Sequence, residues 1–254
     1  MTNIEERLQA HYNKACAHYG PESVLGVFLY GSWNYGTNLE DSDVDTKCIL
    51  IPDLYHLAIK PYEVKHLHID DEVCECMTIQ HMVANWKKQN INFLEILFTP
   101  YCIINALYLS DWLAFTQQYK EDVAHYDIRQ AIMSMGHQAL HTYKQDPSDF
   151  KKQMNVFRIA IALDKLVNNH KYWDCIHLSE RLSEYLRAMR KYGADPEALE
   201  VKLARIRDLI DNADAAAEGI MPSLKVNKGA LDVALNDFII NLIKTHLYYS
   251  GEFD

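Results

Sequence analysis

Apolar and polar residues follow two different periods along the chain. In the first hundred residues the apolar runs have strand length: VLGVFLYG at 24–31, and an alternating segment at 43–51 that closes with ILI. Between residues 62 and 77, YEVKHLHI and EVCECM flank the turn-like pair Asp70 and Asp71. This pattern predicts a hairpin beside two further strands.

Helices are predicted around these strands and throughout the rest of the chain. An amphipathic segment at 5–17 comes first, and Thr78 is suited to cap the first of two short helices, TIQHMVANWKKQN and INFLEILF. One more strand is expected at 101–104. Apolar stripes of helical spacing then predict four helices, in the regions 150–161, 178–189, 199–209 and 231–247. Residues 213–229 are predicted to be a loop or linker.

These elements predict an α+β protein with two domains. Residues 1–105 are expected to form a small mixed sheet with helices, and residues 106–254 an all-α domain that closes a cleft over the sheet. The chain has 254 residues and is 49% hydrophobic, which is ample for a core of this size.

Charge and cysteine content narrow the class of protein. The formal net charge of −10 argues against general nucleic-acid binding, although basic residues gather between 144 and 191 and a local basic cleft stays open. No apolar window reaches the length of a membrane span, and the N-terminus is charged, so we expect a cytoplasmic protein without membrane contact. Six cysteines without paired CxxC motifs indicate reduced thiols, with Cys74 and Cys76 on one strand face rather than in a metal site.

Two aspartates, Asp43 and Asp45, bracket a single valine. On a strand they would point to the same face, where carboxylates so close together repel and raise one another's pKa. A hard divalent cation removes that conflict, because Mg²⁺ accepts one or two protein carboxylates and takes its other ligands from water and phosphates. The alternative is an exposed strand whose acids face water; the spacing does not match an EF-hand.

The neighbouring sequence favours the metal. Gly31 and Ser32 follow an apolar strand directly, and residues 33–37 are able to start a short helix. Glycine allows close approach of a backbone, and serine adds a hydroxyl, as expected for a phosphate site. The chain has no GxxxxGK[ST] motif, so this is not a P-loop.

A third acid is expected on the later strand. Glu75 lies between Cys74 and Cys76, so both cysteines would turn into the core while the carboxylate faces the aspartates. The rival acids at 70–72 are predicted to be hairpin-turn residues in water. We therefore favour Glu75.

This order of features resembles the DNA polymerase β-like nucleotidyltransferase superfamily: an apolar strand, Gly-Ser, about ten residues, Ser-Asp-x-Asp, and an acid on a later strand. The segment YGSWNYGTNLEDSDVDTKCILIP looks especially like the YcgL-type nucleotidyltransferases of bacteria and phages, as does Asn90–Phe98. The resemblance is specific over 24–98 and loose beyond about 145.

The resemblance implies a minimal nucleotidyltransferase fold with its two-metal site. Asp43 and Asp45 would bind two Mg²⁺ ions, with Mn²⁺ as an alternative, and Glu75 would complete one ion and act as, or near, the general base. The nucleotide-binding residues are then expected to be Gly31, Ser32, Ser42, Lys47 and Arg158. Two of these have open alternatives: Lys47 is either a phosphate contact or a surface lysine paired with the acids, and Arg158 either reaches the triphosphate or caps the surface of the helical domain.

The implied reaction is attack of an acceptor hydroxyl on the α-phosphate of a nucleoside triphosphate, with release of pyrophosphate. The acceptor is an RNA 3′ end, a small hydroxylated molecule or a protein side chain, and a non-catalytic nucleotide sensor is the rival class. The sequence leaves open which nucleotide is used and which oligomeric state the chain adopts.

Overall fold

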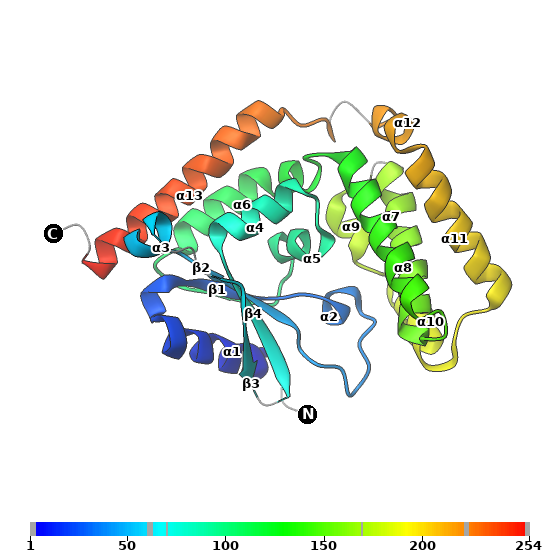
Figure 1. The fold of residues 1–254 in the computed structure, drawn as a ribbon, viewed down its shortest axis with the longest axis horizontal. Coiled ribbons are helices and arrows are strands. Elements are labelled where there is room, and N and C mark those ends of the chain that lie inside the picture. Colours follow the sequence, from blue (N-terminus) through cyan, green and yellow to red (C-terminus); the bar gives the residue numbers. More distant parts are fainter. Residues whose placement is uncertain (1–3, 60–62, 70, 169, 221–223, 252–254) are drawn as a thin grey trace.

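The structure is a computed structural model that describes residues 4–59, 63–69, 71–168, 170–220 and 224–251. A mixed sheet with helices on both faces occupies the N-terminal part, and helices make up the rest (Figure 1). The predicted α+β class is therefore confirmed. The predicted division into domains at 105/106 stays a prediction.

Five strands form one sheet in the order β3-β4-β2-β1-β5. Their bounds are β1 Val24–Leu29, β2 Thr46–Leu50, β3 Lys65–Ile69, β4 Glu72–Thr78 and β5 Cys102–Ile104. Strands β2 and β4 are parallel, and the other neighbours are antiparallel. The predicted hairpin and the short strand at 101–104 are confirmed, although Asp70 of the predicted turn lies outside the described residues.

The helices among the strands lie close to their predicted positions, except α3, which was not predicted. Their bounds are α1 Ile4–Tyr19, α2 Ser32–Tyr35, α3 Leu54–Ala58, α4 Ile79–Lys87 and α5 Ile91–Leu94, with 3-10 turns η1 Pro21–Ser23 and η2 Glu95–Leu97. The Thr78 hydroxyl accepts a hydrogen bond from the His81 N–H at 3.2 Å, which confirms the predicted cap of α4.

Further helices follow β5. They are α6 Leu109–Ala124, α7 Ile128–Gln145, α8 Phe150–Val167, α9 Tyr172–Ile176, α10 Glu180–Tyr192, α11 Pro196–Asp211, α12 Ala213–Glu218 and α13 Lys228–Ser250. The four predicted helices are confirmed as α8, α10, α11 and α13, whereas α6, α7, α9 and α12 were not predicted. The predicted linker at 213–229 is wrong in its first part, because α12 forms there.

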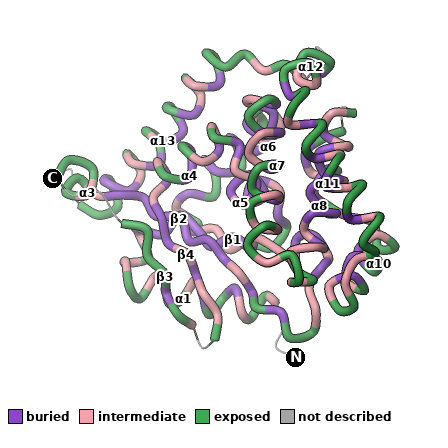
Figure 2. Tube along the Cα trace, turned by 45° about the vertical axis from the view of Figure 1, so that its right-hand side comes forward, coloured by how far each residue is buried: buried purple, intermediate pink, exposed green. Residues whose placement is uncertain are grey.

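Each face of the sheet has its own core. Helix α1 covers one face through Leu8 and Ala15, which pack on Val27 and Leu29. On the other face, a single cluster of buried apolar residues runs from β1 through the helices to Leu242 on α13. Figure 2 shows the inner strands as buried and the outer helix faces as exposed.

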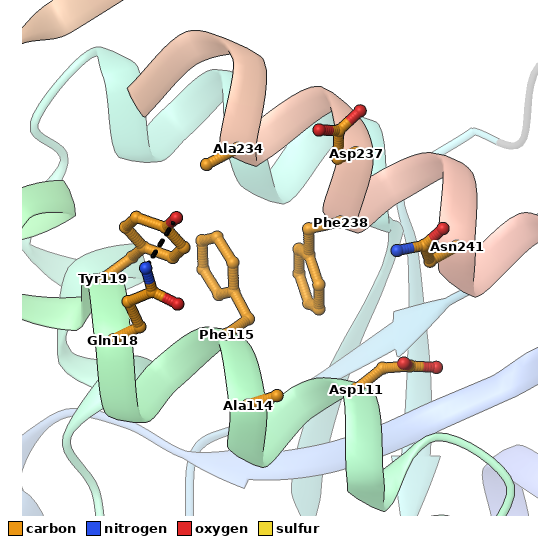
Figure 3. Close-up of a pocket in the computed structure, with 9 residues that line it drawn as sticks. All are labelled: Asp111, Ala114, Phe115, Gln118, Tyr119, Ala234, Asp237, Phe238 and Asn241. Atoms are coloured by element: carbon orange, nitrogen blue, oxygen red, sulfur yellow. Dashed lines mark hydrogen bonds between the residues drawn. The ribbon is translucent and has the colours of Figure 1, made fainter. Parts of the chain in front are cut away.

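Helix α13 returns to the sheet half. It packs along α6, where the Phe115 and Phe238 rings stack with centroids 4.2 Å apart, beside a small pocket of about 220 Å³ (Figure 3). Near its end, His246 Nδ1 lies 3.0 Å from the carbonyl oxygen of Glu22, just before β1. The last helix of the chain thus helps to hold the start of the central strand.

Within the described ranges, no helix is both long enough and apolar enough to cross a bilayer. All six cysteines are free thiols, and Cys74 and Cys76 are fully buried on the strand face opposite Glu75, as expected. Localisation in the cytoplasm stays a prediction.

Candidate active site

The turn after β1 requires glycine. Gly31 has φ 86° and ψ −146°, a backbone conformation that L side chains rarely adopt. A Cβ atom on Gly31 would lie 3.4 Å from Asp45 Oδ2, so the turn passes close to the second aspartate. Ser32 opens the short helix α2, which confirms the predicted helix in this region.

A buried carboxylate holds this turn from behind. Glu95 is fully buried, and its Oε2 accepts hydrogen bonds at 2.9 Å from both the Gly31 N–H and Asn34 Nδ2. Its Oε1 accepts the Tyr35 hydroxyl at 2.5 Å. Burial raises the pKa of Glu95, while the three hydrogen bonds and the nearby Arg158 oppose that rise. Because all three partners are donors, an acceptor-only side chain fits this position.

The aspartate pair lies just before a strand, not on one. The predicted strand at 43–51 begins only at Thr46, because its pairing with β1 starts at Leu29↔Thr46 and its pairing with β4 starts at Thr46↔Cys74. Upstream of Thr46, β1 has already bent away into the Gly31 turn. One backbone hydrogen bond joins Tyr30 N–H to the Asp45 carbonyl at 3.0 Å, and the Trp33 indole Nε1–H donates to the Asp43 carbonyl at 3.0 Å.

The alternation expected of a strand survives in this extended segment. Val44 is fully buried, whereas Asp43 is exposed and Asp45 partly exposed. Burial raises the pKa of Asp45; the positive charge of Lys151 opposes this, and the negative charge of Asp43 adds to it. The second aspartate thus sits in a site that disfavours an uncompensated negative charge.

Glu72 supports the aspartate segment, contrary to its predicted place in a solvated turn. It is the first residue of β4, and its Oε1 accepts the N–H of Val44, the residue between the aspartates, at 3.0 Å. Arg7 pairs with the same carboxylate, and His11 Nε2 lies 3.0 Å from Oε2. The prediction failed because Glu72 pairs with α1, a contact that local turn chemistry does not indicate.

Glu75 is paired with a lysine. Lys47 on β2 lies in register with Glu75 on β4, and Lys47 Nζ donates to Glu75 Oε2. The lysine side chain is only 2% exposed, so the predicted alternative of a surface lysine is wrong. Its contact with a phosphate and the metal-binding role of Glu75 stay predictions.

A cavity of about 450 Å³ opens between the Gly31 turn and helix α8. On the sheet side it is lined by Tyr30, Gly31, Ser32, Tyr35, Thr37, Asp45 and Asn92, and on the helical side by Thr142, Asp149, Lys151, Lys152, Met154, Asn155 and Arg158. Four predicted site residues therefore meet here: Gly31, Ser32, Asp45 and Arg158.

Other predicted site residues lie beside the cavity rather than on its wall. Asp43 and Ser42 line a separate hollow against α1. The Ser42 hydroxyl accepts the Leu39 N–H at 2.8 Å, which closes a turn in the loop before the aspartates. Its predicted nucleotide contact stays a prediction.

Arg158 is held in place with spare donor capacity. It is 7% exposed, and its guanidinium carbon lies 3.9 Å from the centroid of the Tyr35 ring. Nε and Nη2 both donate to Asn155 Oδ1, at 3.1 and 2.7 Å, and Nη1 is buried without a hydrogen-bond partner. An arginine so arranged at a cavity wall is suited to an anion such as a phosphate.

Asp43 and Asp45 are suited to a cation that is also coordinated by a bound phosphate ligand. Within the described residues, no three His, Cys, Asp or Glu side chains gather closely enough to hold a metal by themselves. The carboxylates of Asp43 and Asp45 are nevertheless the hard oxygen ligands that Mg²⁺ and Mn²⁺ prefer, and Mg²⁺ needs only one or two of them when phosphates supply the rest. The donor set therefore fits a metal–nucleotide complex rather than a closed metal cage.

Comparison with known proteins identifies the family of this chain. Residues 2–219 match the family model described as RlaP, RNA repair pathway DNA polymerase beta family. No curated protein gives a significant match. The family match supports the predicted DNA polymerase β-like nucleotidyltransferase superfamily, while special nearness to YcgL-type members is not confirmed. The chain belongs to the RNA repair pathway DNA polymerase beta family.

Proposed function

We propose that this protein transfers a nucleoside monophosphate from a nucleoside triphosphate to an acceptor hydroxyl and releases pyrophosphate, and that the acceptor is an RNA 3′ end. The observation that carries the proposal is the single cavity where the Gly31–Ser32 turn and Asp45 face Lys151, Lys152 and Arg158. The family described for RNA repair supports the choice of acceptor.

The charges in the cavity match those of a nucleotide. Three cationic side chains on α8 face the triphosphate position, and the Ser32 hydroxyl at the glycine turn adds a donor from the opposite wall. Tyr30 and Tyr35 contribute aromatic surface on the same side as the turn. The triphosphate would thus be held between the turn and the basic helix.

Asp43 and Asp45 would hold the divalent cation. Two neighbouring carboxylates, one of them in a place that raises its pKa, gain from a positive ion between them. When bound, such a cation neutralises phosphate charge and polarises the phosphoryl group. Both the dependence on Mg²⁺ and the use of a second ion are part of the proposal.

In the transfer step the acceptor oxygen bonds to the α-phosphorus, the bond from that phosphorus to the bridging oxygen breaks, and pyrophosphate leaves with the electron pair. The basic side chains of α8 stabilise the charge that builds up on the leaving group. The hydroxyl proton is released to water, because both aspartates are assigned to the cation.

The test is a labelling experiment with a blocked-end control. Purified protein, Mg²⁺ and each of the four α-³²P-labelled nucleoside triphosphates are incubated with RNA that carries a free 3′ hydroxyl or a periodate-oxidised 3′ end. We expect label in the free-ended RNA only. The Asp43→Asn and Asp45→Asn variants should lose it, whereas Asp41→Asn, an exposed acid of the same loop, should retain it.

The alternatives appear as different outcomes. Label in protein or in small molecules, absent from Asp45→Asn, keeps the reaction and refutes the RNA acceptor. Nucleotide binding by calorimetry without transfer to any fraction supports a nucleotide sensor instead. Full labelling by Asp45→Asn would refute the catalytic assignment itself.

A further inference from the structure

The side chain of Lys47 is enclosed to an unusual degree for a lysine. It is 2% exposed, with Nζ lying 4.0 Å from the Tyr30 ring centroid and 4.3 Å from that of Phe93. A buried ammonium is costly unless it is paired, and aromatic faces add only part of the compensation. Glu75 supplies the opposite charge.

The pair is built into the sheet. Lys47 and Glu75 are register partners on the parallel strands β2 and β4, so their side chains leave the same face side by side. Tyr30 comes from the end of β1 and Phe93 from α5, which close the lysine in from two more elements. Four separate segments therefore fix the ammonium beside one carboxylate.

Within the described part of the chain, this arrangement gives Glu75, but neither aspartate, a directly paired positive charge. The Glu75 carboxylate already has a fixed positive partner, and a divalent cation at the same oxygen would face repulsion from an ammonium that has no open route away. Among the described residues, by contrast, neither Asp43 nor Asp45 forms an ion pair within 4.0 Å, although Lys151 and Lys47 act to lower the pKa of Asp45 from farther away. The negative charge that still needs a cation is on the aspartates.

We propose that Lys47 takes the place of a cation at Glu75, so that Asp43 and Asp45 hold the catalytic cation without Glu75. Glu75 then acts as a positioning residue that fixes Lys47 at the base of the site. This inference rests on the proposed function, because it concerns the same cation site.

The direct test is Mn²⁺ binding, with the free and bound ion counted by electron paramagnetic resonance and the affinity measured by calorimetry. We expect Asp45→Asn to weaken Mn²⁺ binding by about tenfold or more, as loss of a ligand does. Glu75→Gln should change it by less than about twofold, because Glu75 is not a ligand.

Removing the lysine should expose Glu75 to a cation. Lys47→Met is expected to tighten Mn²⁺ binding by about tenfold or to add a second bound ion, and the double variant Lys47→Met with Glu75→Gln should lose that gain. Lys65→Met on β3, whose lysine is exposed, is the matched control and should behave as wild type. Circular dichroism establishes that each variant is folded; if Lys47→Met is not, Lys47→Arg takes its place in the series and should leave Mn²⁺ binding unchanged.

Failure of this inference and failure of the proposed function give different patterns. If Glu75→Gln weakens Mn²⁺ as much as Asp45→Asn does, Glu75 is a ligand and the inference is overturned, while the cation site stands. If Asp45→Asn leaves Mn²⁺ binding unchanged, the cation site of the proposed function is overturned instead.

Discussion

Replacement of Glu95 tests whether a buried carboxylate holds the Gly31 turn. Glu95 accepts three hydrogen bonds, from the Gly31 N–H, from Asn34 and from Tyr35, and it has no exposure to solvent. Glu95→Ala removes all three acceptors. Glu95→Gln keeps the shape and one acceptor oxygen, which is able to serve Gly31 and Asn34 while the Tyr35 hydroxyl turns to accept from the new amide.

The two variants should differ widely in the free energy of unfolding. Each buried donor left without a partner costs about 1–3 kcal/mol. Relief of the buried charge offsets part of that sum, so we expect Glu95→Ala to lose about 3–5 kcal/mol. For Glu95→Gln the weaker neutral bonds and the relief from burying a charge nearly cancel, and we expect a loss of about 1 kcal/mol or less.

The dependence of stability on pH gives an independent check. Burial raises the pKa of Glu95 above its ordinary 4.5. Between 4.5 and the raised pKa, the folded protein therefore binds a proton that the unfolded chain releases, so this residue's contribution to the free energy of unfolding falls as pH rises through that interval. Glutamine does not titrate. Wild type should thus lose stability relative to Glu95→Gln as pH rises from 4.5.

Urea unfolding followed by circular dichroism at several pH values measures both effects, with the exposed Glu184→Gln of α10 as the control. In the labelling assay we expect Glu95→Gln to keep activity within about tenfold and Glu95→Ala to lose about a hundredfold, because the turn is misplaced. A cost below about 1 kcal/mol for Glu95→Ala, or parallel pH profiles for wild type and Glu95→Gln, would refute the reasoning.

Three further substitutions probe the rest of the site. Gly31→Ala should cost about 1–2 kcal/mol in urea unfolding, because φ is 86°, and should lower labelling, since the strained turn lines the cavity. Arg158→Gln should raise KM for the nucleoside triphosphate about tenfold in steady-state kinetics, through loss of one charged contact. Glu72→Gln should lower kcat and leave KM unchanged, because the Val44 bond that supports the aspartates weakens.

Each of these three substitutions has a matched control variant and a result that would contradict the expectation. Gly229→Ala places its Cβ in ordinary van der Waals contact, 3.6 Å from Asn227 Oδ1, and should be neutral. Arg205→Gln, on α11 away from the cavity, and Glu40→Gln, in the loop before the aspartates, should leave the kinetics unchanged. Equal effects of the paired variants on KM or kcat would show that the losses come from general destabilisation.

Local sequence patterns predicted the positions of the strands and the face of the sheet on which Glu75 lies. Alternation placed Cys74 and Cys76 in the core and Glu75 on the other face, since neighbouring strand residues always point to opposite faces. The same alternation put Asp43 and Asp45 inside a strand, which is wrong. Where a strand begins depends on its partners, and both partners of β2 come into register only at Thr46.

Contacts between distant segments were not predictable from spacing. The role of Glu95 depends on a hydrogen bond across 64 residues of sequence, and no local feature of that apolar run indicates its partner. Lys151 and Lys152 belonged to a predicted basic region, but only the packing of α8 shows that they face the Gly31 turn. The helical spacing of apolar residues predicted α8, but it did not indicate which face of that helix lines a cavity.

The helical part shapes the cavity as well as lining it. Two arginines of α10 reach the loop that follows the glycine turn: Arg187 donates to the Gly36 carbonyl at 2.6 Å and Arg190 to the Thr37 carbonyl at 3.0 Å. This loop joins the Gly31 turn to the aspartates, so α10 anchors the segment between them. The sheet half therefore supplies the acids, while the helical half supplies both the basic wall and the clamp. A site that divides its charges in this way forms only when α8 and α10 are packed against the sheet half, which ties correct folding of the whole chain to the chemistry proposed for it.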